Sequence, residues 1–199
     1  GGGGVGSWAV QIASKMCGLE VTATASHDKS REWCKRMGAA TVIDHSEVAT
    51  LPLNSFEYVL SLSDRVNISH LASVVKPFGK VCLVVGGEGI KNVDLSLMFF
   101  KRCSLSMEVV FARTRNWEEP ERQGVLLAAL GRAIERGQLT PICTKVLDWT
   151  EVATAHEESI EGHCVGKTVL RMWSKTQLNQ PQEEQVLGDR EGSQGAAAA

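Results

Sequence analysis

The chain begins with the six residues GGGGVG, which run directly into a helical pattern. Gly1, Gly3 and Gly6 fit the spacing G-x-G-x-x-G, in which separate glycines allow a tight turn, a close approach of backbone to phosphate, and close packing of helix on strand. The free N–H groups and the dipole at the start of such a helix bind phosphate. A flexible linker is also rich in glycine, so the interpretation depends on the residues that follow.

Helical and extended patterns alternate after the glycines. We expect helices over 7–16, 29–37, 68–79, 118–137 and 150–159, the last of them capped by Thr150, and a short helix or turn over 94–102. We expect strands over 19–26, 40–44, 56–63, 80–87, 104–113, 142–148 and 166–172. This alternation is typical of an α/β fold with a parallel sheet.

Composition limits the classes of function. A chain of 199 residues that is 43% hydrophobic can bury a substantial core, and a net charge of −2 does not suggest nucleic acid or a membrane as a partner. The six cysteines are scattered without a C-x-x-C pair, which favours reduced thiols and a cytoplasmic location. We find no spacing of cysteine and histidine that indicates a zinc site.

The residues after the second expected strand bear on the choice of cofactor. In a dinucleotide-binding fold this strand ends beside the adenosine ribose, where an acidic residue favours NAD. Ser26 stands there, followed by Lys29 and Arg31, and a hydroxyl with two cations suits the 2′-phosphate of NADP. Asp28 would oppose a phosphate if it pointed inward, and Lys29 and Arg31 could instead belong to a solvated helical turn. NADP is therefore the preferred cofactor, with NAD as the alternative.

Several stretches together resemble the medium-chain dehydrogenase/reductase superfamily. They are the glycine-rich start, CKRMGAATVIDH, FEYVLSLSD, VKPFGKVCLVVG, KRCSLSMEVVFAR and the closing VATAHEESIEGHCVGKTVLRM. Within that superfamily they are most similar to the zinc-type alcohol dehydrogenase-like and quinone oxidoreductase branch. The resemblance extends from Gly1 to about Met172.

The resemblance implies a Rossmann-like, doubly wound parallel sheet that lacks its first, central strand, and a short C-terminal helix–strand remnant of the catalytic domain. We expect an NAD(P)-binding domain over 1–140, a return to the catalytic domain over 141–173, and a disordered tail over 174–199. The family's N-terminal domain, which forms the substrate pocket, has no counterpart here. The unpaired strand edges would invite pairing by another segment or chain.

The resemblance also implies a set of cofactor-binding residues. The glycine loop would contact the pyrophosphate, Ser26, Lys29 and Arg31 would surround the adenosine phosphate, and His45 would lie beside the adenosine unless it is an exposed loop residue. Residues at strand ends would lie near the nicotinamide, although the two glycines among them could form a plain turn and the arginine could be a surface residue. The complete set is Gly1, Gly3, Gly4, Val5, Gly6, Ser26, Lys29, Arg31, His45, Ser61, Gly86, Gly87, Phe111 and Arg113.

These expectations give one preferred function and one alternative. The preferred function is an NADP(H)-dependent oxidoreductase that acts on a small-molecule carbonyl, enone or quinone. Residues 1–199 would supply its cofactor-binding portion, and the protein could form a homodimer. No residue is assigned a catalytic role because the cofactor supplies the hydride chemistry. The alternative is a non-catalytic nucleotide-binding module. For residues 1–199 alone we expect weak cofactor binding at best, and no turnover.

Overall fold

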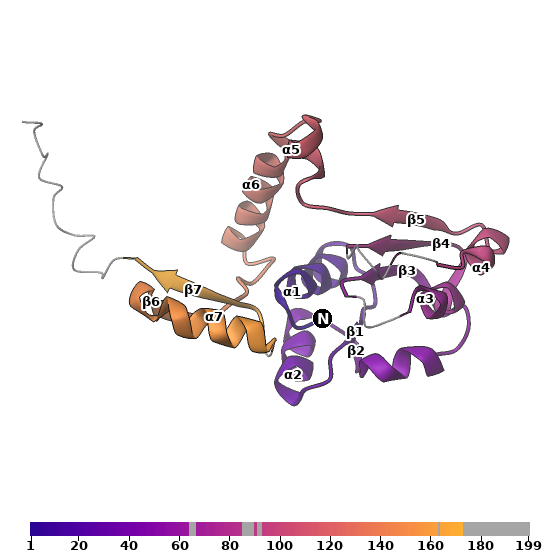
Figure 1. The fold of residues 1–199 in the computed structure, drawn as a ribbon, viewed down its shortest axis with the longest axis horizontal. Coiled ribbons are helices and arrows are strands. Elements are labelled where there is room, and N and C mark those ends of the chain that lie inside the picture. The colour runs from indigo at the N-terminus through magenta and orange to yellow at the C-terminus, as the bar shows by residue number, and fades with distance from the viewer. Residues whose placement is uncertain (64–66, 85–89, 91–92, 163, 173–199) are drawn as a thin grey trace, which may run out of the picture.

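The structure is a computed structural model that describes residues 1–63, 67–84, 90, 93–162 and 164–172 (Figure 1). The cofactor-binding role of Gly86 and Gly87 and the disordered tail over 174–199 concern residues outside these ranges, so both stay predictions. Among the described residues, no helix combines the length and the apolar character that a membrane span requires.

The first part of the chain forms a helix–strand–helix–strand unit. Helix α1 (Gly4–Gln11) begins inside the glycine run and continues as a π-helical turn, Ile12–Met16. Strand β1 (Thr22–Thr24), helix α2 (Asp28–Met37), strand β2 (Thr41–Ile43) and a 3₁₀ helix, His45–Thr50, follow. Strands β1 and β2 are parallel, with Ala23 opposite Val42. The expected helix over 29–37 is confirmed, and Gly38 ends it at a φ of 114°.

The second part forms a three-stranded parallel sheet in the order β3-β4-β5. Its elements are β3 (Phe56–Ser61), α3 (Ile68–Val74), β4 (Val75–Leu83), α4 (Ser96–Phe100) and β5 (Ser104–Met107). The expected helix over 68–79 is wrong in its second half, because β4 begins at Val75 and runs through Pro77 and Gly79. The Lys101 ammonium group donates to the carbonyls of Ala72, Ser73 and Val75, which satisfies the end of α3 without a glycine cap.

The remaining elements are α5 (Ala112–Asn116), α6 (Arg122–Glu135), β6 (Cys143–Asp148), α7 (Val152–Glu161) and β7 (Lys167–Arg171). Strands β6 and β7 form a separate parallel pair. The expected cap at Thr150 is wrong: Asp148 accepts a hydrogen bond from the Thr150 amide and caps a 3₁₀ turn, Trp149–Glu151, that precedes α7.

The sheets confirm the parallel α/β fold class. Within the described ranges, β1-β2 and β3-β4-β5 are two separate sheets. Within each sheet the strand order agrees with the doubly wound order 3-2-1-4-5-6, in which β2 and β1 correspond to places three and two, and β3, β4 and β5 to places four to six. Each sheet has its own apolar core, one around Trp33 and Cys34 and one around Leu71 and Val81.

The end of the described chain returns to its beginning. Gly3 and Gly166 form a parallel bridge, and the Gly166 amide donates to the Gly2 carbonyl at 2.9 Å. The buried Gln11 side chain exchanges two hydrogen bonds with the backbone of Thr140, at 2.9 and 3.0 Å. In Figure 1 the β6–β7 pair and α7 accordingly lie next to α1 and α2. The glycine loop and α1 are thus held by segments more than 120 residues away in the sequence.

Candidate functional site

The glycine loop is a structured turn rather than a flexible leader. Gly3 is the N-cap of α1 and has extended dihedrals, so Gly4, Val5 and Gly6 form the first helical turn with their amides free of intrahelical partners. The buried Ser7 hydroxyl donates to the Gly3 carbonyl at 2.7 Å and accepts from the Trp33 indole N–H at 2.7 Å. Trp33 of α2 therefore fixes the turn through Ser7.

Contacts on its inner side explain the small residues of the loop. A Cβ atom on Gly6 would lie 2.4 Å from the Gly1 carbonyl oxygen, and one on Gly1 would lie 2.9 Å from the Ala23 Cβ and the Cys34 sulfur. A Cβ on Gly3 would meet nothing within 4 Å. The loop is therefore tightly packed against β1 and α2 but open at Gly3, beside the free amides of α1, as a phosphate site requires.

Lys167, at the start of β7, places a cation on this loop. A Cβ on Gly4 would lie 2.4 Å from Lys167 Cε and 3.1 Å from Lys167 Nζ, so the lysine side chain passes directly over the Gly4 backbone. The Gly3–Gly166 bridge fixes the neighbouring residue and brings Lys167 here. An ammonium group beside free helical amides adds a full positive charge to the partial charge of the helix dipole.

A second polar cluster lies at the carboxyl ends of β1 and β2. Ser26 Oγ is 3.0 Å from His45 Nδ1, so the structure brings these two predicted residues together. The Arg31 guanidinium donates to the Val42 carbonyl at 3.3 Å and lies 3.9 Å from the Asp44 carboxylate. Lys29 is exposed and forms no ion pair with any residue in the described ranges. Ser26, Arg31 and His45 therefore meet on one patch.

Asp44 is the acidic centre of this cluster. Its carboxylate accepts from the amide and the hydroxyl of Ser46, at 2.9 and 2.8 Å. The Ser46 amide, followed by the Ser26 and Ser46 hydroxyls, holds the pKa of Asp44 well below its usual range. Asp44 is consequently a full negative charge at neutral pH, next to Arg31.

The remaining predicted residues in the described ranges belong to other elements. Ser61, at the end of β3, donates to the Ser63 carbonyl. Phe111 is exposed and caps α5, and Arg113 within α5 forms an ion pair with Glu119 at 2.8 Å. The expected strand over 104–113 is wrong beyond Met107, where β5 ends, so Phe111 and Arg113 lie at and within α5 instead of at the end of a strand.

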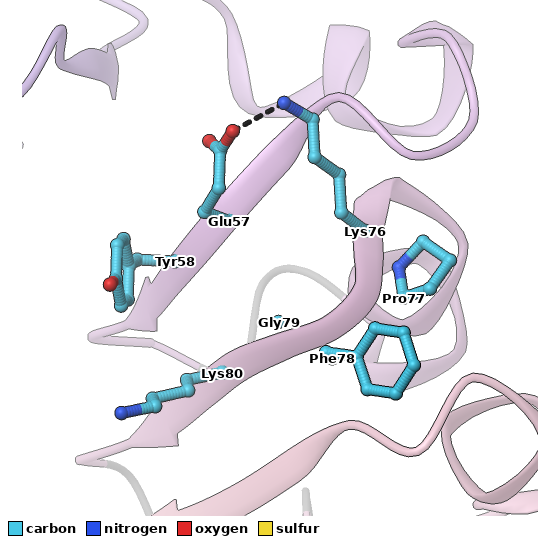
Figure 2. A pocket seen from close by; sticks show the side chains of 7 residues that line it. All are labelled: Glu57, Tyr58, Lys76, Pro77, Phe78, Gly79 and Lys80. Atoms are coloured by element: carbon cyan, nitrogen blue, oxygen red, sulfur yellow. Dashed lines mark hydrogen bonds and ion pairs between the residues drawn. The ribbon is translucent and has the colours of Figure 1, made fainter.

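A surface cavity of about 260 Å³ lies at the amino ends of β3 and β4 in the second sheet. Figure 2 shows its lining, which comes from the start of β3 and the start of β4: Glu57, Tyr58, Lys76, Pro77, Phe78, Gly79 and Lys80. Lys76 and Glu57 form an ion pair across it. Ligands of doubly wound sheets bind at the carboxyl ends of the strands, whereas this cavity is at the amino ends. We therefore do not assign it to the cofactor.

The described part of the chain contains no group of three or more His, Cys, Asp or Glu side chains that could hold a metal ion.

Sequence reasoning missed Lys167, Asp44 and Ser7. Lys167 belongs to a Gly-Lys pair whose proximity to residues 3 and 4 appears only once β7 is placed. Asp44 follows the second strand directly, and the D-x-x-E spacing of Asp44 and Glu47 signals a capping box, which could have revealed its position.

Comparison with known proteins now identifies the family. Residues 37–170 match the family model described as zinc-binding dehydrogenase, so the chain belongs to this family, and the predicted resemblance is confirmed. A zinc-type alcohol dehydrogenase-like protein of Staphylococcus aureus is 29% identical over 181 residues, covering 86% of this chain and 53% of the relative. Human quinone oxidoreductase is 29% identical over 176 residues, covering 84% and 51%. The chain thus spans about half the length of the curated relatives it matches.

Solved structures agree with this assignment. A Rhizobium etli protein described as a zinc-dependent alcohol dehydrogenase has a TM-score of 0.72 and 33% identity, covering 87% of this chain and 53% of its own. A mycobacterial protein complexed with NADPH has a TM-score of 0.70 and 23% identity, covering 86% and 54%. At that identity the second comparison supports the fold alone.

Proposed function

We propose that this chain forms the NADP(H)-binding portion of an oxidoreductase. The observation that carries the proposal is the pairing of two sites on neighbouring elements. One is the open glycine turn with free α1 amides beneath Lys167, and the other is the cluster of Ser26, Arg31 and His45 at the ends of β1 and β2. Both lie on the edge of the sheet where a doubly wound fold binds a dinucleotide.

The two sites suit different phosphates of the cofactor. The glycine turn would hold the pyrophosphate, since helix N-termini and ammonium groups both favour anions. Ser26, Lys29 and Arg31 would hold the 2′-phosphate, which distinguishes NADP from NAD, through charge-assisted hydrogen bonds. The mycobacterial protein of the same fold is complexed with NADPH, so a fold of this kind can accommodate that cofactor.

When bound, the nicotinamide would supply the hydride, and the residues of this chain would bind and orient it. The alcohol dehydrogenase-like and quinone oxidoreductase relatives support a small carbonyl, enone or quinone as the substrate class. All six cysteines are free thiols, which suits a reducing compartment such as the cytoplasm. We propose that residues 1–140 form the cofactor-binding domain.

A non-catalytic nucleotide-binding module is the second candidate. Two observations favour it: β1-β2 and β3-β4-β5 are separate sheets within the described ranges, and Tyr58 and Leu60 on β3 are exposed. Such a module would bind the adenosine half of the cofactor, which meets only the first sheet, and would not orient the nicotinamide.

Changing the adenosine site should change the choice of cofactor. The double variant Ser26→Asp with Lys29→Ala should lose the preference for NADPH over NADH, because an acidic side chain favours the free ribose hydroxyl and repels the 2′-phosphate. Calorimetric titrations with both cofactors measure this. Lys35→Ala is the matched control, because Lys35 lies in the last turn of α2, the helix that begins beside Lys29; it should leave both affinities unchanged. If the double variant keeps the NADPH preference, the assignment of this site is wrong.

A further inference from the structure

The adenosine site contains a negative charge where a phosphate ligand would prefer none. The Asp44 carboxylate lies 3.9 Å from Arg31 Nη2, and Ser26 Oγ lies 3.0 Å from the ring of the next residue, His45. Asp44 thus pairs with Arg31, one of the groups that would bind the 2′-phosphate. The Asp44 and Arg31 side chains are 30% and 32% exposed, so their interaction is only partly screened by water.

We propose that Asp44 is an internal competitor for the 2′-phosphate, and that its charge limits the selectivity of this site for NADPH over NADH. The inference rests on the proposed function, since it presupposes that the Ser26 and Arg31 cluster receives the adenosine half of NADP. It concerns a residue with no place in the predicted cofactor set.

Coulomb interactions determine the direction of the effect. A 2′-phosphate brings nearly two negative charges, and a carboxylate at the same patch repels it while holding Arg31. NADH carries a neutral hydroxyl at this position, so its affinity responds weakly to the charge of Asp44. Removing that charge should therefore raise the affinity for NADPH and leave the affinity for NADH nearly constant.

The local structure allows the charge to be removed without removing the cap. Asp44 is the N-cap of the 3₁₀ helix His45–Thr50, with its own amide bound to Glu47. Asparagine keeps an oxygen acceptor for the Ser46 amide and is an equally good N-cap residue. Asp44→Asn is accordingly a charge change at a preserved turn.

Asp148 provides a matched control. It also caps a 3₁₀ turn, accepts from the amide and hydroxyl of Thr150 at 3.1 and 2.7 Å, and has its amide bound by Glu151 at 3.0 Å. It lies at the end of β6 and outside the proposed cofactor site. Asp148→Asn therefore reproduces the structural change of Asp44→Asn without its effect on a 2′-phosphate.

The test is calorimetric titration of NADPH and NADH into the wild-type protein, Asp44→Asn and Asp148→Asn, with the pair 2′,5′-ADP and 5′-AMP as adenosine probes. We expect Asp44→Asn to bind NADPH and 2′,5′-ADP about fivefold more tightly, the effect of one partly screened charge pair. NADH and 5′-AMP should change less than about twofold, and Asp148→Asn should match the wild type. The gain should shrink in 0.5 M salt because the interaction is electrostatic.

Three outcomes would overturn the inference. Unchanged or weaker NADPH binding by Asp44→Asn would show that Asp44 does not compete with the phosphate. A loss of NADH binding by this variant would show that Asp44 holds the ribose hydroxyl instead. An equal gain in Asp148→Asn would show a general effect of charge. The proposed function is judged separately, by whether the wild-type protein prefers NADPH: that preference can hold while the Asp44 inference fails.

Discussion

Gly6 shows how single residues determine the shape of the proposed phosphate turn. Its hydrogen-only side chain is required by the Gly1 carbonyl, which would lie 2.4 Å from any Cβ atom. That contact is between parts of the loop backbone, so the requirement for glycine exists before any ligand binds. The G-x-G-x-x-G spacing thus reports a packing constraint here, in addition to a phosphate site.

Gly6→Ala should therefore destabilise the fold. A methyl group on residue 6 would clash with the Gly1 carbonyl and push Gly1 away from α1. We expect a loss of about 2–3 kcal/mol in the free energy of unfolding. Gly131→Ala, within α6, is the matched control: a Cβ there meets nothing within 4 Å, and alanine should stabilise the helix by about 0.5–1 kcal/mol. Chemical denaturation of both variants measures the difference. Equal stabilities for the two variants would refute the packing argument.

At the scale of elements, β7 matters because it places the Lys167 ammonium group at the N-terminal glycine turn. The Gly3–Gly166 bridge fixes the start of β7 against the glycine turn, and Lys167 then lies over Gly4. The pyrophosphate is common to NADPH and NADH. A cation at this position should thus strengthen the binding of both cofactors, whereas the Ser26 and Arg31 cluster should act on NADPH alone.

Lys167→Ala should weaken NADPH and NADH binding by the same factor, about three- to tenfold, since one charge-assisted contact to the pyrophosphate is lost. Lys145→Ala is the control, because Lys145 lies on the neighbouring strand β6 and pairs with Glu158. Titration of both cofactors into both variants gives the comparison. An effect of Lys167→Ala on NADPH alone would move this lysine from the pyrophosphate to the 2′-phosphate.

The elements that the sequence predicted best are those with local signals. The helix over 29–37 could be predicted because a glycine, Gly38, follows it, and in the structure Gly38 takes the left-handed conformation that ends the helix. The end of α3 could not be predicted in the same way, because Lys101 supplies its cap from more than 25 residues away. Similarly, Lys167 reaches Gly4 only through the pairing of distant segments. Local patterns thus gave the elements, and contacts between distant segments gave the remaining parts of the site.

At the scale of the whole molecule, the sheets β1-β2 and β3-β4-β5 have separate cores within the described part of the chain. The core around Trp33 joins α1, β1, α2 and Ile142, while the core around Leu71 belongs to β3, β4 and their helices. The two proposed phosphate sites both lie on the first core. Binding of the adenosine and pyrophosphate groups should therefore depend on this half of the fold, and placement of the nicotinamide should depend on the other half.

The central claim is that this fold binds NADP(H) and recognises its 2′-phosphate. The most direct test is a calorimetric titration of the wild-type protein with NADPH and, separately, with NADH under identical salt and pH. We predict that NADPH binds at least about tenfold more tightly, which corresponds to about 1.4 kcal/mol of binding free energy. Equal affinities, tighter binding of NADH, or no binding of either cofactor at millimolar concentration would contradict the claim.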